Sequence, residues 1–146
     1  MMTEREQFHL HGDGERGFGY AQAVRIGDTV HIAGTMAVND AMEVIHPGNV
    51  AAQMAVVYDD LGRTLGQFGL DFGHVVRESI FTTDMGGLLA ANEVRKACFT
   101  GGCLPATTAV EVRALAFPGL VVEVAVEARA DLDPAAGVRE LPGVGA

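Results

Sequence analysis

The chain has 146 residues, with 19 acidic and 10 basic side chains, so its formal net charge is −9. This length fits a single domain, and an apolar share of 49% with only 20% charged residues can build a core, which argues against disorder. The nine arginines and one lysine form no cluster that could neutralise a phosphate backbone, so we expect no nucleic-acid partner.

The sequence contains no signal for a membrane, an export pathway or a metal. No apolar run reaches the roughly 18 residues of a membrane span, and the first residues, MMTEREQFHLHGDGE, are too polar for a signal peptide. Cys98 and Cys103 match no zinc or redox spacing, and His9 and His11 have no carboxylate partner at metal-site spacing. We therefore expect a cytoplasmic protein without membrane partner, metal or cofactor.

In chain order, the first predicted elements are strands. A short apolar run at residues 7–10 indicates an edge strand. Two alternating runs within residues 20–34 flank Gly27-Asp28 and predict a β-hairpin, and residues 35–47 are typical of a loop.

Two amphipathic helices are predicted. Apolar residues recur every three or four positions over residues 50–68, with Asn49 as the N-cap and Gln53 on the helix surface. The second helix covers about residues 87–99, with Asp84 as its N-cap.

Three further strands are predicted at residues 75–83, 107–115 and 120–130. The resulting order, β, β, β, α, β, α, β, β, favours an α+β fold in which a mixed sheet of about six strands carries both helices on one face. In the last strand, valines alternate with Glu123, Ala125 and Glu127. The second face of the sheet is therefore partly polar, which is typical of a surface buried against other subunits, and we expect an obligate oligomer.

Four segments, in this order and spacing, resemble the RidA/YjgF family, also known as L-PSP endoribonucleases. They are GYAQAVRIGDTVHIAGT, the run from AAQMAVVYDDLG to FTTDM, LLAANEVRKACF, and the pair LPATTAVEVRAL and LVVEVAVEARA. The resemblance spans residues 17–130. It implies one RidA-like domain over residues 1–130, in which residues 1–16 are an N-terminal extension with the edge strand, followed by a flexible tail at residues 131–146.

The resemblance also implies a chorismate-mutase-like fold. In this family three copies form a homotrimer around a central β-barrel, with helices outside and a cleft between neighbouring subunits. Its best-known members hydrolyse reactive enamines and imines, such as 2-aminoacrylate, to 2-oxo acids and ammonia.

One departure from the family pattern concerns the substrate carboxylate. The family holds this carboxylate with an arginine directly after Pro-Ala, whereas here Pro105-Ala106 is followed by Thr107. Loss of such a charged hydrogen bond removes roughly 1.5–3 kcal/mol, so 2-aminoacrylate is expected to be a poor substrate. Arg77 and Arg95 are the arginines that could instead reach a cleft from a neighbouring subunit.

The resemblance implies six site residues. Glu123 matches the family glutamate and would orient the attacking water, which makes it the catalytic candidate. The expected ligand-binding residues are Tyr20, Gly34, Thr35, Asn92 and Thr107. For Tyr20 and Thr35 a purely structural role at the barrel interface is an equal alternative, and Asn92 could join its helix to a loop.

Two functions follow as hypotheses. The first is a hydrolase or deaminase that acts on a small imine, enamine or related metabolite in clefts between subunits. The alternative is a non-catalytic trimer that binds a small molecule or acts as a chaperone. RNA cleavage is disfavoured because the chain is acidic and lacks a histidine pair for general acid and base catalysis.

Overall fold

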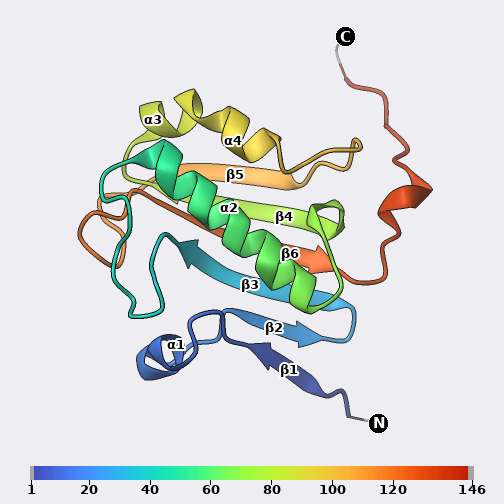
Figure 1. Ribbon diagram of the computed structural model, residues 1–146. Coiled ribbons are helices and arrows are strands. Elements are labelled where there is room, and N and C mark those ends of the chain that lie inside the picture. Colours follow the sequence, from blue (N-terminus) through green and yellow to red (C-terminus); the bar gives the residue numbers. More distant parts are fainter. Residues whose placement is uncertain (1, 145–146) are drawn as a thin grey trace.

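A computed structural model describes residues 2–144 of the chain. A six-stranded mixed sheet with strand order β1-β2-β3-β6-β4-β5 forms the centre of the fold (Figure 1). The strands are β1 (Arg5–Phe8), β2 (Ala23–Ile26), β3 (Thr29–Met36), β4 (Val75–Thr82), β5 (Ala106–Glu111) and β6 (Val122–Arg129). Neighbouring strands are antiparallel except β4 and β5, which are parallel. The predicted mixed sheet of about six strands is confirmed.

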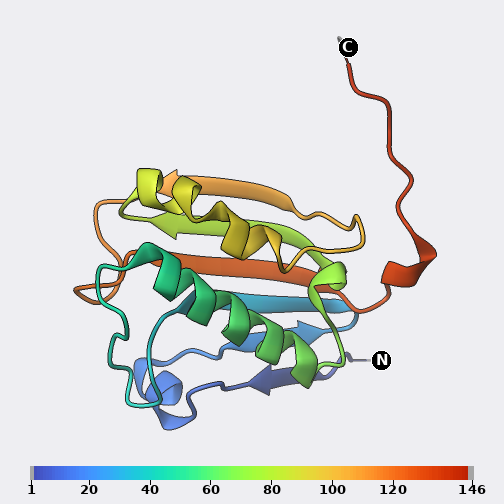
Figure 2. The same cartoon turned by 45° about the horizontal axis from the view of Figure 1, so that its top comes forward.

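The long helix α2 lies across one face of the sheet, and two short helices continue this layer over β4 and β5 (Figure 2). The helices are α1 (Asp13–Phe18), α2 (Val50–Gln67), α3 (Met85–Ala90) and α4 (Asn92–Lys96), with single 3-10 turns η1 (Phe72–His74) and η2 (Pro134–Ala136). No helix of residues 2–144 lies across the opposite face of the sheet. We call it the helix-free face.

The alternation in β6 assigns residues to these two faces as expected. Val122, Val124 and Val126 are buried in the core under α2, so Glu123 and Glu127 point to the helix-free face. At about 25 cal/mol per Å² of buried apolar surface, this valine row and the apolar side of α2 contribute much of the driving force for folding.

Both predicted helix caps are confirmed. The Asn49 side chain accepts a hydrogen bond from the backbone N–H of Ala52, and Asp84 accepts one from Gly87. The second helix, however, begins at Met85 and is interrupted at Ala91, which separates α3 from α4.

Gln53 was wrongly predicted to lie on the helix surface. Its side chain is fully buried, and its amide donates to the carbonyl oxygens of Ile45, His46 and Gly119 and accepts from the N–H of Val121. The helical pattern could not reveal this role, because the carbonyls that need a donor belong to two loops far apart in the sequence.

Two strand predictions were misplaced. The edge strand lies at Arg5–Phe8 rather than 7–10, and β5 ends at Glu111 rather than at residue 115. All six residues of β5 are exposed in the single chain, so its pattern is not shaped by burial within this chain.

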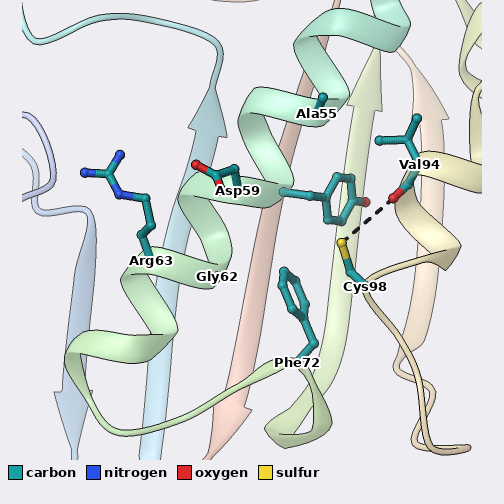
Figure 3. Close-up of a pocket in the computed structure, with 8 residues that line it drawn as sticks. Ala55, Asp59, Gly62, Arg63, Phe72, Val94 and Cys98 are labelled. Carbon is teal, nitrogen blue, oxygen red and sulfur yellow. Dashed lines mark hydrogen bonds between the residues drawn. The ribbon is translucent and has the colours of Figure 1, made fainter.

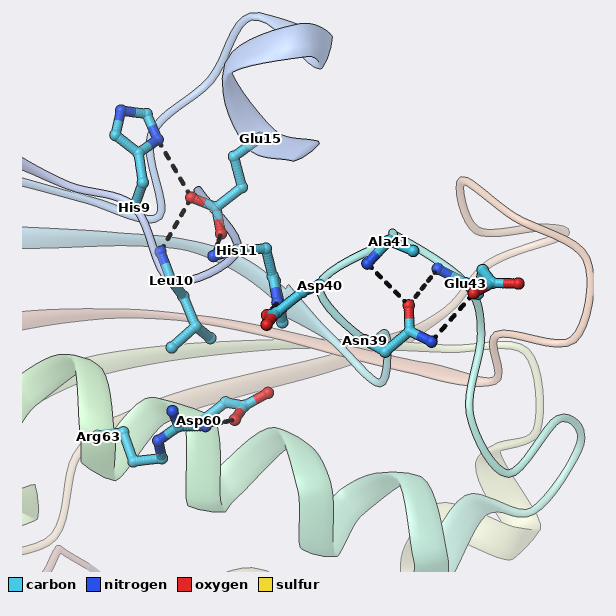
Figure 4. A network of polar contacts seen from close by, with 10 residues as sticks. All are labelled: His9, Leu10, His11, Glu15, Asn39, Asp40, Ala41, Glu43, Asp60 and Arg63. Atoms are coloured by element: carbon cyan, nitrogen blue, oxygen red, sulfur yellow. Dashed lines mark hydrogen bonds and ion pairs between the residues drawn. The ribbon is translucent and has the colours of Figure 1, made fainter. Parts of the chain in front are cut away.

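Helix α1 was not predicted, because its segment, DGERGF, contains two glycines that disfavour helix. A buried carboxylate holds it in place. Glu15 is fully buried and accepts hydrogen bonds from the backbone N–H groups of Leu10 and His11, while His9 Nδ1 lies 3.2 Å from Glu15 Oε1 (Figure 4).

Within residues 2–144, no helix has both the length and the apolar character needed to cross a membrane. The same residues contain no group of three or more His, Cys, Asp or Glu side chains placed to hold a metal ion. Cys98 and Cys103 are free thiols, both half-buried.

Candidate functional site

Glu123 lies on the helix-free face of β6, opposite the irregular part of β3. It is half-buried, and its carboxylate forms no hydrogen bond or ion pair with any side chain or backbone group among residues 2–144. Burial raises the pKa of this carboxyl group. A carboxylate that costs desolvation energy without a partner in its own chain is a strong candidate for a functional group.

Gly34 permits this position of Glu123. A Cβ atom on Gly34 would lie 2.6 Å from Glu123 Oε2, which is closer than any real contact allows. The β3 ladder is irregular between Ile32 and Thr35, and this bulge carries Gly34 past the carboxylate. Gly34 is therefore needed for a close approach and not for an unusual backbone conformation.

Tyr20 precedes β2 and lies close enough to Glu123 for the negative charge of this carboxylate to affect the pKa of the phenol. Partial burial, together with the negative charges of Glu15 and Glu123, raises the pKa of Tyr20 to about 12. The phenol therefore stays protonated at neutral pH and can donate a hydrogen bond.

Thr35 is held on the other side of the sheet. Its hydroxyl is buried, donates to the carbonyl of Ala33 and accepts from Gln22 Nε2 at 3.0 Å, and the same Gln22 amide reaches Thr64 on α2. These bonds join the hairpin to the long helix, so within one chain Thr35 stabilises the core.

Thr107 also lies on the helix side, because its register partner is the inward-facing Glu78 on β4. Its hydroxyl donates to Glu78 Oε1 at 2.8 Å and accepts from Arg95 Nη2 at 2.9 Å. Arg95 also binds Glu78 Oε1 through Nε at 2.7 Å and Nη2 at 2.6 Å. The fully buried carboxylate of Glu78 is thus paired with a guanidinium that is only 15% exposed.

The remaining oxygen of Glu78 is also satisfied. Tyr58 on α2 donates its hydroxyl to Glu78 Oε2 at 2.7 Å, and burial and the negative charge of Glu78 raise the pKa of Tyr58, so it stays a donor. Asn92 begins α4 one helical turn before Arg95 and is half-buried. The three-residue spacing places Asn92 and Arg95 on the same side of this helix.

The comparison with protein families decides the identity of the fold. The family model described as Endoribonuclease L-PSP matches residues 17–130. The chain belongs to this family. The match coincides with the span of the resemblance in sequence, and the RidA/YjgF assignment and its α+β fold are confirmed.

Individual relatives agree with this assignment. Protein DfrA of Myxococcus xanthus is 40% identical over 98 residues, which cover 66% of this chain and 74% of that protein. The 2-iminobutanoate/2-iminopropanoate deaminase of Bos taurus is 31% identical over 102 residues, or 70% of this chain and 74% of that protein. The crystal structure of a member of the highly conserved YjgF/YER057c/UK114 family from Mycobacterium tuberculosis is 35% identical, with a TM-score of 0.74, and covers 86% of this chain and 99% of that chain.

In this RidA-family chain the six expected site residues fall into separate groups. Tyr20 and Gly34 gather around Glu123, on the helix-free side. Thr107 lies with Arg95 at the β5 edge, on the helix side, Asn92 begins the helix that carries Arg95, and Thr35 is in the core. One chain does not bring Thr107 and Glu123 together, because strand alternation places them on opposite faces of the sheet.

A cavity of about 540 Å³ lies between α2 and α4 on the outer side of the helix layer (Figure 3). Its walls are mainly apolar and include Phe72, Val94 and Cys98. Burial raises the pKa of the Cys98 thiol, which lowers its reactivity at neutral pH. None of the six expected site residues lines this cavity.

Sequence reasoning did not identify Glu78. A signal was present: Glu78 occupies an inward position of the strand VVRESIFT, where the other inward residues are Val75, Ile80 and Thr82. A charged residue at such a position needs a buried partner of opposite charge. The sequence offers Arg95 as an arginine for a cleft but does not identify it as the partner of Glu78.

Proposed function

We propose that this chain is a cytoplasmic hydrolase of the RidA type that deaminates a small reactive imine or enamine in clefts between the subunits of a homotrimer. The half-buried carboxylate of Glu123, which has no partner among residues 2–144, carries the proposal. Related proteins named 2-iminobutanoate/2-iminopropanoate deaminase support the reaction class.

The subunit arrangement is proposed from the separation of the two groups of site residues. Because Glu123 and Thr107 lie on opposite faces of one sheet, a cleft that contains both needs two chains. The group around Glu123 would come from one subunit, and Asn92 with Thr107 from the exposed β5 edge of a neighbour. Six unburied residues on an edge strand are the type of surface that a second chain covers.

The reaction consumes one water per substrate. Glu123 in its ionised form accepts a proton from water while the oxygen bonds to the imine carbon and the C=N π electrons move to the nitrogen, and Glu123 then passes this proton to the nitrogen to give a carbinolamine. In the second step Glu123 accepts the hydroxyl proton and delivers it to the nitrogen as the C–N bond breaks, which leaves a carbonyl and ammonia. A raised pKa improves Glu123 as a base, and the Tyr20 hydroxyl is suited to donate to the substrate.

The substrate is proposed not to be 2-aminoacrylate, whose carboxylate is bonded to the imine carbon. Position 107 carries a neutral hydroxyl, and the nearest guanidinium, that of Arg95, already shares its charge with Glu78. A carboxylate placed there meets an ion pair with almost no net charge, so it gains little attraction.

A non-catalytic role as a small-molecule binder or chaperone-like trimer is the second candidate. The observation that favours it is the same neutralised Arg95, because a site without a free cation in this position has lost one anchor for an anionic transition state.

Turnover by the glutamate variants distinguishes the two functions. We expect wild-type protein to hydrolyse at least one of a panel of imines without a carboxylate on the imine carbon faster than 2-aminoacrylate, with ammonia release lowered about 100-fold or more in Glu123→Gln. The matched control is Glu127→Gln, on the same strand and face but paired with His31, which should retain activity. Equal ammonia release by wild type and Glu123→Gln for every imine overturns the hydrolase.

A further inference from the structure

A second cavity, of about 520 Å³, lies beside Tyr20 and is formed by β1, α1 and the start of β2. Its lining is unusually basic for a chain with a net charge of −9. The lining residues are Arg5, Gln7, His9, Arg16, Gly19, Tyr20, Ala21 and Val24.

Strand geometry explains how these side chains converge. Phe8 packs against the core beneath α2, so the alternating residues Arg5 and Gln7 point to the helix-free face, with Val24 opposite Gln7. Glu6 alternates with them and points away from the cavity. The acidic residue of β1 is thereby kept off this side.

The charges in the cavity are only partly compensated. Arg5 forms no ion pair with any residue of the described range 2–144, whereas Arg16 Nη1 lies 3.3 Å from Asp13 Oδ1 in a pair that is largely exposed. Exposed pairs of this kind are weak and can exchange partners. His9 uses Nδ1 toward Glu15 Oε1, which leaves its second ring nitrogen for a ligand.

We propose that this cavity binds the anionic end, a carboxylate or a phosphate, of the molecule whose imine carbon is presented to Glu123. Two arginines, one histidine and the Gln7 amide supply hydrogen-bond donors for the oxygens of either anion, and Tyr20 connects the cavity to the Glu123 group. The assignment of substrate class rests on the proposed function.

The size of the cavity defines the substrate further. A volume of about 520 Å³ lies in the range that holds ligands much larger than a three-carbon imine. Glu123 does not line this cavity, so an anionic group bound there is separated by several bonds from the carbon presented to Glu123. An anion can bind here despite the net charge of −9, because two of the ten basic residues converge at this cavity.

The test measures anion binding without turnover. Inorganic phosphate and, in a separate arm, acetate are titrated into the full-length protein while amide chemical shifts or heat are recorded. We expect at least one anion to bind wild type in a salt-sensitive way, and the double variant Arg5→Gln/Arg16→Gln to bind it about tenfold more weakly or worse. The arm with the tighter binding identifies the anion.

Arg25→Gln is the control for a general charge effect. Arg25 lies on the neighbouring strand β2 but pairs with Val30 and Glu6, on the helix side, and its Nε donates to the carbonyl of Gly27. Its removal should leave anion binding unchanged. Equal weakening by the control and the double variant overturns the proposal, as does the absence of binding to both anions.

The number of subunits in the assembly is measured by native mass spectrometry on the same samples. A double variant that keeps its assembly and loses anion binding supports the proposal, whereas one that loses its assembly and keeps anion binding overturns it. Failure of the proposed function is separate: absence of imine hydrolysis in wild type, with anion binding still dependent on Arg5 and Arg16, rejects the hydrolase and leaves the anion site standing.

Discussion

Arg95 Nη2 donates to Thr107 Oγ1 at 2.9 Å, so a guanidinium from α4 reaches the position where the family resemblance implies an arginine of β5. The cation is present but not free, because Nε and Nη2 of Arg95 both bind Glu78 Oε1. Local charge at this edge is therefore set by a pair of residues from α4 and β4, and not by the residue at position 107.

Thr107→Arg should add a free cation at this edge. Glu78 is already occupied by Arg95, so the new guanidinium cannot be neutralised by the same carboxylate. We expect KM for 2-aminoacrylate to fall about 10- to 100-fold, since a charged hydrogen bond contributes about 1.5–3 kcal/mol. The control is Thr108→Arg, whose side chain lies beside Arg77 on the helix-free face; an equal fall in KM there would contradict the assignment to position 107.

Arg95→Ala should destabilise the fold strongly. It leaves the buried Glu78 carboxylate without its cation, which costs about 3–5 kcal/mol in the free energy of unfolding, measured by urea denaturation. Addition of Glu78→Gln to this variant should recover part of the loss, because the amide is uncharged. Lys96→Ala breaks only an exposed pair with Glu93 and should change stability by less than about 1 kcal/mol. A small effect of Arg95→Ala would show that water reaches Glu78.

Activity should depend on pH through Glu123. Because the pKa of Glu123 is raised, its ionised base form is lost at a higher pH than for an ordinary glutamate. We therefore expect kcat/KM to rise with pH and to reach its plateau at a higher pH than an ordinary glutamate would give. The same raised pKa means that the folded protein favours the protonated form of Glu123 more than the unfolded chain does. Relative to Glu123→Gln, wild type should therefore be most stable below the usual glutamate pKa and lose stability as pH rises through the raised pKa. A stability difference that does not change with pH would contradict the raised pKa.

Gly34→Ala should impair catalysis more than folding. The new methyl group meets the Glu123 carboxylate, so the carboxylate has to move. We expect kcat to fall at least tenfold, whereas the variant should still unfold in one cooperative transition. Gly66→Ala is the matched control. It lies in α2 with no atom near its added methyl group, and it should raise stability by about 0.5–1 kcal/mol without changing kcat. Equal kcat in both variants would remove Gly34 from the site.

Much of the fold could be predicted because its signals are local. The period of α2, the hairpin around Gly27-Asp28 and the valine alternation of β6 each depend on neighbours within one element. The caps Asn49 and Asp84 were predictable for the same reason. Helix α1 was not, because its glycine-rich segment is held by the buried Glu15 and not by helix propensity.

The site was only partly predictable. The sequence by itself determined that Glu123 would face away from the valine core and that residue 107 would carry no cation. Only the tertiary structure decided which side chains surround these positions. It placed Arg95 and Glu78 at Thr107, left Glu123 without a partner in the described chain, and gathered Arg5 and Arg16 beside Tyr20. The physical reason is that burial and charge pairing depend on distances between elements far apart in the sequence, which the period of a single helix or strand does not encode.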